Sequence, residues 1–248
     1  APGQSIEYEA NPDYWDRRRR PGFERLRLLL VPRAEDRVAM LRAGEVDMTI
    51  LSLADVEPLR REGFAFQGPQ YVASTTLRFF ASYDPAYLTS RVEFRKALAL
   101  ALDLPSLVRA VYPPEAASPG RGSALFSPAS PGHDSAMSSY PYDSEAAKAL
   151  LRQAGYGGET VPLLSVVAYG LTEMVQMNEL MAEAWRQAGV NVRVIQTDFP
   201  SVLARYAVRP QVFQDLAPAP LFHGAFANQP DILSVVRRYM TSTADGVL

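Results

Sequence analysis

Few residues of this chain could carry out chemistry, and none forms a catalytic pattern. The 248 residues include no cysteine and two histidines, His133 and His223, which are far apart in sequence. Thiol nucleophiles and thiolate metal sites are thus excluded, and a histidine-rich metal site is not expected. There is no Gly-x-Ser-x-Gly elbow, and the segment Gly120–Ser123 lacks the rest of a phosphate-binding loop. The lack of a nucleophile–base pair favours a binding protein over an enzyme.

Two segments carry aromatic and polar side chains suited to a ligand. In the first, Phe80 to Asp84, Tyr83 could stack on a ligand or donate its hydroxyl. The second, Phe222 to Asp231, offers two aromatic faces and two polar tips. Ordinary hinge or loop packing would account for the same side chains. The residues we expect to bind ligand are Tyr83, Phe222, His223, Phe226 and Asn228.

Other clusters have simpler explanations. Arg17 to Arg20 could bind phosphate, but the near-neutral charge balance favours a solvated loop. Met174, Met177 and Met181 have the spacing of a core-facing helical stripe. With 25 Lys+Arg against 27 Asp+Glu, the formal charge of −2 does not suggest a nucleic-acid partner. The chain is 48% hydrophobic, enough for a core, yet it has no apolar run long enough to span a membrane.

Strands and helices alternate in the second half of the chain, which predicts an α/β fold with a parallel βαβαβ layer. A loop from Pro218 to Gln229 follows this layer. The expected elements are a strand at Leu163–Tyr169, a helix at Thr172–Ala188, a strand at Val190–Val194, a helix capped by Asp198 and a strand at Val212–Leu216.

The first half mixes strands and helices, and a segment from Tyr112 to Tyr142 rich in proline, serine and glycine interrupts the pattern. A segment so rich in helix and strand breakers predicts a surface or functional loop. The other expected elements are strands at Gln4–Ala10, Glu24–Val31 and Tyr71–Phe80, a helix from Ala34 that ends at Gly44, helices from Val92 and Pro105, and a helix capped by Asp143 and Ser144.

Several motifs, in a fixed order, resemble the extracellular solute-binding proteins of family 5, which serve peptide and nickel ABC importers. Each motif alone is weak, but together they extend over nearly all of the chain. They are Asn11-Pro-Asp-Tyr-Trp15, the Arg37–Asp47 helix and strand, the Val92–Asp103 helix, Tyr142–Tyr156, Leu180–Val194 and Asn228-Gln-Pro-Asp231.

The resemblance implies a periplasmic-binding-protein type II-like lobe, a mixed sheet flanked by helices, plus part of a second lobe. Residues 1–82 would be a partial lobe one. Residues 83–248 would be a nearly complete lobe two that contains the Pro/Ser-rich loop at 112–142. Family members are about twice as long, so the chain is expected to be a fragment.

The resemblance also implies a substrate-binding component of an ABC importer, in the periplasm or outside a cell that has no outer membrane. It would capture a small solute, most plausibly an oligopeptide, between two lobes and present it to the permease. No nucleic acid, metal or cofactor is implied, and the membrane is contacted only through the permease. The alternatives are a hydrolase of peptides or esters that uses the 112–142 loop, and a ligand-sensing module without a transport role.

One segment departs from the peptide-binding members of the family. These often place an acidic residue before this loop's proline, to pair with the ligand's amino group. Here Phe226 to Pro230 contains no acid, and Asp231 follows the proline. Recognition of a free amino terminus is therefore not expected, which leaves a blocked or longer peptide, or another solute.

Overall fold

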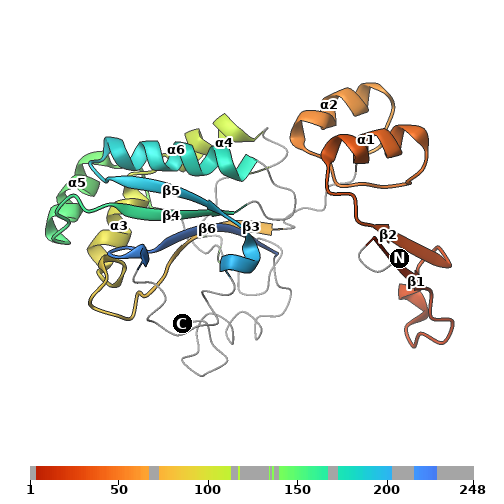
Figure 1. Cartoon of the computed structure of the whole chain (residues 1–248), viewed down its shortest axis with the longest axis horizontal. Helices are drawn as coiled ribbons and strands as arrows, with labels where there is room; N and C mark the ends of the chain where they lie inside the picture. Colours follow the sequence, from red (N-terminus) through yellow and green to blue (C-terminus); the bar gives the residue numbers. More distant parts are fainter. Residues whose placement is uncertain are drawn as a thin grey trace. The chain divides into compact units, whose positions relative to one another are not determined.

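The computed structural model describes residues 4–66, 73–112, 117, 134, 136, 140–166, 173–202 and 215–227, with backbone only at 73, 74 and 225–227. Two compact units divide the chain, Ala1–Phe66 and Gln67–Leu248 (Figure 1). The predicted 112–142 loop lies almost entirely outside the described residues.

The first unit combines a two-stranded hairpin with two helices. Strand β1 (Ser5–Glu9) pairs antiparallel with β2 (Arg25–Leu29), and both lie within the segments predicted to be strands. The arginine cluster lies between them, in a 3₁₀ turn at Arg17–Arg19. Helices α1 (Ala34–Ala43) and α2 (Leu53–Arg61) follow.

The ends of α1 follow from its sequence. Gly44 adopts the left-handed conformation with φ of 71°, and its N–H donates to the Leu41 carbonyl at 3.1 Å. Near the start of α1, Arg37 donates to three backbone carbonyl groups at 2.9 to 3.0 Å, those of Val31, Pro32 and Ile50. Arg37 therefore ties both segments that flank the helix to α1.

The second unit contains a four-stranded mixed sheet in the order β3-β6-β4-β5. Strand β4 (Val161–Val166) is parallel to both β5 (Val192–Thr197) and β6 (Leu221–Ala227), as a strand–helix–strand layer requires. Strand β3 (Ala73–Phe79) pairs antiparallel with β6. Helix α6 (Glu173–Gln187) connects β4 to β5 and lies along the sheet (Figure 1).

The predicted position of the third parallel strand is wrong. Residues 212–214 of the expected strand lie outside the described residues, and residues 215–216 form a short helical turn. The strand is instead β6, within the segment predicted to be a loop. Pro218, Pro220 and Gly224 are typical of loops, yet Leu221 and Phe222 are buried on opposite faces of the sheet. Burial on both faces outweighs these local breakers.

Helices cover one face of this sheet and form the main core. They are α3 (Val92–Leu100), α4 (Leu104–Val111), α5 (Ser144–Gln153) and α6, and a 3₁₀ turn at Leu88–Ser90 precedes them. Within this core the buried Trp185 indole of α6 donates to the Leu98 carbonyl of α3 at 2.8 Å. A smaller cluster on the opposite face includes Phe80 and Phe222, whose stacked ring centroids lie 5.9 Å apart.

The compact units differ from the predicted division at residues 82 and 83. Because β3 pairs with β6 along its whole length, it belongs to the sheet of the second unit. The boundary between the units thus falls between Phe66 and Gln67, before β3. The assignment of the two units to lobes stays a prediction.

Candidate functional site

The candidate ligand site is the carboxyl end of the parallel strands β4 and β6, because ligands of open α/β sheets bind beyond that edge. Strand β3 runs in the opposite direction, so its first residue, Ala73, pairs with Ala227, the last of β6. This end of the sheet thus combines the carboxyl ends of β4 and β6 with the start of β3.

Three of the predicted site residues, Phe222, His223 and Phe226, lie on strand β6, and Tyr83 lies away from Phe226. Phe226 pairs with Ser74 near the carboxyl end of β6, whereas Phe79 pairs with Leu221 at the amino end. Tyr83, in the turn after β3 and 58% exposed, therefore lies at the amino end. Along a seven-residue strand the two ends are roughly 20 Å apart. Asn228 lies outside the described residues.

Phe222 and His223 are adjacent in β6, so their side chains point to opposite faces of the sheet, and both are buried. The Phe222 ring packs on Phe80 and also covers the backbone of Gly224, where an added Cβ would clash with the ring. The position of the Phe222 ring therefore requires glycine at 224. Phe222 is a packing residue that supports the strand.

His223 belongs to a buried polar triad with Asn178 of α6 and Ser165 of β4. Nδ2 of Asn178 donates to Oγ of Ser165 at 2.6 Å. Its Oδ1 then faces Nδ1 of His223 at 2.6 Å, which makes Nδ1 the protonated ring nitrogen. All three side chains are buried, and burial lowers the pKa of His223 to about 4. The imidazole is therefore neutral at pH 7.

The triad holds two strands and a helix in register near the candidate site. Ser165 and His223 are register partners on β4 and β6, but the serine hydroxyl accepts from Asn178 and makes no hydrogen bond with the imidazole. The triad therefore does not form a nucleophile–base pair. It satisfies three buried polar groups, and so fixes α6 to the carboxyl half of the sheet.

Sequence reasoning identified His223 but missed Ser165 and Asn178. A signal was present, because Asn178 interrupts the apolar stripe of Met174, Met177 and Met181, all buried on α6. Ser165 likewise interrupts a strand whose other residues are apolar. Polar residues at positions that the pattern assigns to the core predict a buried network.

One further polar atom lies near this edge. Oγ1 of Thr76 is buried and has no hydrogen-bond partner, alone among the buried side-chain polar atoms of the described residues. Thr76 pairs with Gly224 across β3 and β6. Its hydroxyl has capacity to bind a water molecule or a ligand group.

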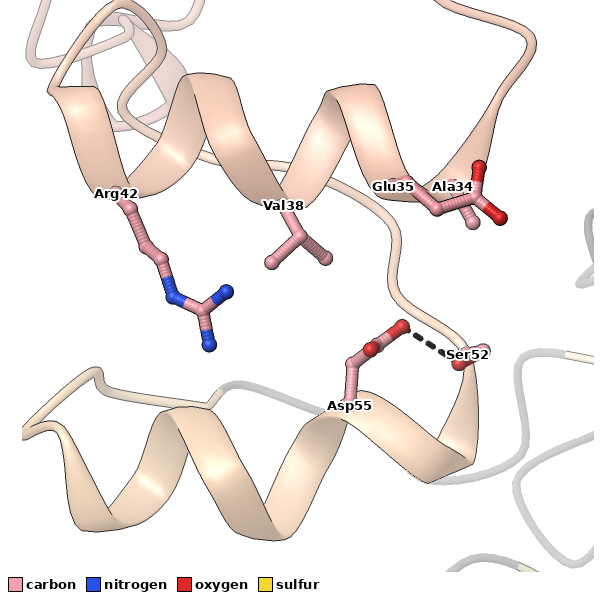
Figure 2. A pocket seen from close by; sticks show the side chains of 6 residues that line it. All are labelled: Ala34, Glu35, Val38, Arg42, Ser52 and Asp55. Atoms are coloured by element: carbon pink, nitrogen blue, oxygen red, sulfur yellow. Dashed lines mark hydrogen bonds between the residues drawn. The ribbon is translucent and has the colours of Figure 1, made fainter.

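A separate pocket of about 350 Å³ lies in the first unit, between α1 and α2. Figure 2 shows Val38 and Arg42 pointing from α1 toward α2, and Asp55 accepting from the Ser52 hydroxyl at 2.6 Å. Arg42 is already bound by both carboxylate oxygens of Glu62, at 2.8 and 2.5 Å. That pairing raises the pKa of Arg42 and lowers the pKa of Glu62, so the pocket's cation is neutralised within the unit.

The described part of the chain contains neither a metal-binding cluster nor a membrane-spanning helix. No three His, Asp or Glu side chains there are placed to hold a metal ion together. None of the helices described has both the length and the apolar character to cross a membrane.

Comparison with known proteins identifies the family. The model of the bacterial extracellular solute-binding proteins, family 5 Middle, matches residues 1–245. The chain belongs to solute-binding protein family 5. Members of family 5 are binding proteins, and this confirms the predicted resemblance.

Relatives within family 5 are named for different ligands. Heme-binding protein A of Haemophilus influenzae is 30% identical over 77% of this chain and 35% of its own length. Di/tripeptide-binding protein 2 of Pseudomonas aeruginosa is 27% identical, over 81% of this chain and 37% of its length. The chain thus spans little more than a third of these relatives.

The fold is shared with solved family structures. NikZ from Campylobacter jejuni, crystallised with Ni(L-His), matches all of this chain and 49% of its own, with a TM-score of 0.73 and 17% identity. This confirms the predicted α/β fold class, a type II periplasmic-binding-protein lobe with a mixed sheet flanked by helices.

Proposed function

We propose that this chain is part of the solute-binding component of an ABC importer, which captures a peptide and presents it to the permease outside the cytoplasmic membrane. The observation that carries the proposal is the family 5 match over residues 1–245. The di/tripeptide-binding relative favours a peptide over other solutes. The open mixed sheet also supports the proposal, because ligands of such sheets bind beyond the carboxyl ends of the parallel strands.

The ligand site is proposed at the carboxyl end of β6. There Phe226 and Asn228 would contact the ligand, while Phe222 and His223, both buried, support the strand. Peptide backbone would be held by hydrogen bonds, with side chains in wet pockets. Since Phe226 to Pro230 holds no acid, the site would bind a peptide without pairing its free amino group to a carboxylate of that segment.

Calorimetry on the full-length gene product, with peptides identified by mass spectrometry of copurifying ligands, tests this site. Asn228→Ala should weaken binding about 10-fold or more through the loss of one polar contact to ligand. Tyr83→Ala is the matched control at the other end of β6 and should leave the affinity unchanged. Weakened binding in Tyr83→Ala alone would contradict this assignment and place the site at the amino end of β6.

We also propose that the protein catalyses no reaction on its ligand. Among the described residues, the Ser165 and His223 pair comes nearest to a catalytic arrangement, and Asn178 intervenes between them. Turnover of peptide or ester substrates by the purified protein would support a hydrolase instead. Ligand binding without any effect of gene deletion on uptake would support a sensing module.

A further inference from the structure

The hairpin of the first unit has two chemically different faces. Ile6 lies opposite Leu28, and Tyr8 lies opposite Leu26, so these four side chains share one face. The alternate face carries charges, with Glu7 and Arg27 3.4 Å apart and a second ion pair between Glu9 and Arg25. This alternation is typical of a strand pair with one face buried and one in water.

Among the described residues of the first unit, none buries the apolar face. Its four side chains are between 39% and 56% exposed: Ile6, Tyr8, Leu26 and Leu28. Among residues 4–66 only Val38 and Leu59 are buried hydrophobic residues. An isolated two-stranded hairpin is marginal in water, and the described part of the unit offers it no core.

We propose that polypeptide of the same protein, outside these 248 residues, covers this apolar face with apolar side chains. The length of the relatives supports this occupant, because about half of the Campylobacter chain and nearly two thirds of the Haemophilus protein lie outside the match. The ion pairs on the other face keep that face in water and so fix which side is covered.

The area of the face argues against a second copy as the occupant. Two paired five-residue strands form a face of roughly 17 Å by 10 Å, which is an area of about 170 Å². A stable dimer buries about 800 Å² on each partner, so this face alone is too small. A contact within one polypeptide carries no cost of lost translational freedom and needs no such area.

Cysteine accessibility tests the proposal, because the chain has no native cysteine. Tyr8→Cys and Leu28→Cys place a thiol on the apolar face, and Glu7→Cys is the matched control on the charged face of the same strand. Each variant is made in the 248-residue chain and in the full-length gene product, and maleimide labelling rates are measured. Hydrogen exchange of residues 4–31 in the unsubstituted proteins gives a second readout if a variant fails to fold.

Both apolar-face thiols should label rapidly in the 248-residue chain and about 10-fold or more slowly in the full-length protein, while Glu7→Cys labels equally in both. Equal labelling of the apolar-face thiols in the two proteins would overturn the proposal. So would protection in the 248-residue chain itself: concentration-dependent protection would assign the face to a second copy, and concentration-independent protection to the chain's own second unit. A gene that encodes no further polypeptide would also overturn it.

Discussion

Nδ1 of His223 lies 2.6 Å from Oδ1 of Asn178, and this contact joins the central strand β6 to helix α6 inside the core. Because Asn178 also donates to Ser165, one amide satisfies polar groups on two neighbouring strands. The stability of the second unit therefore depends on one buried side chain of α6.

The neutral His223 should make stability depend on pH. Burial lowers the pKa of His223 to about 4 in the folded state, against 6.5 for an exposed histidine. The stabilisation is complete above pH 6.5 and is lost as the pH falls toward 4, because the unfolded state then binds the proton first. The full loss is about 3 kcal/mol. Urea unfolding at pH 7 and pH 4.5 measures most of this loss, and His223→Gln should reduce the difference between the two pH values.

Removal of the shared amide should be costly. Asn178→Ala leaves buried polar atoms of Ser165 and His223 without their partner, which should lower the free energy of unfolding by about 2–4 kcal/mol. Gln187→Ala, at an exposed position of the same helix, should change it by less than about 0.5 kcal/mol. Equal effects of the two substitutions would show that the triad contributes no stability.

Gly224 should not tolerate a side chain. In Gly224→Ala the new Cβ would clash with the Phe222 ring, which cannot shift easily because it packs on Phe80. We expect a loss of about 1–3 kcal/mol in unfolding free energy. Gly157→Ala, whose Cβ would meet a flexible Glu159 carboxylate at 3.4 Å, is the control and should be nearly neutral. A Gly224→Ala protein of unchanged stability would mean that the ring does not occupy this position.

Arg37 should not be replaceable by lysine. Its guanidinium donates to three carbonyls, and a single ammonium group cannot reproduce that planar geometry. Arg37→Lys should destabilise the first unit by about 1 kcal/mol, so that amides of α1 exchange about 5-fold faster. Arg61→Lys, at an exposed position of α2, is the control. Unchanged exchange in Arg37→Lys would contradict the assigned role.

Elements with strong local signals could be predicted from the sequence. Asp143 caps α5 through its carboxylate, which accepts from the N–H of Ala146 at 2.9 Å, and Gly44 ends α1, both as predicted. The strand–helix–strand order likewise predicted the parallel β4 and β5 pair. These features depend on residues close in sequence, where capping and periodicity decide the conformation.

Strand β6 and the triad could not be predicted in the same way. The local sequence around His223, with prolines and a glycine, is typical of a loop, and only pairing with β3 and β4 makes it a strand. The contact between His223 and Asn178 depends on the register of three separate elements. The separation of Tyr83 from Phe226 could not be predicted either, because the direction of β3 relative to β6 is a tertiary property.

The burial of Trp185 against Leu98 gives the protein an internal optical probe. The chain has two tryptophans, and they fall in different units: Trp15 in the first, 80% exposed, and Trp185 in the second, fully buried. Iodide in solution should quench Trp15 emission and leave the blue-shifted Trp185 emission largely intact. A red shift of the quencher-resistant component would then report separation of α6 from α3, independently of any event in the first unit.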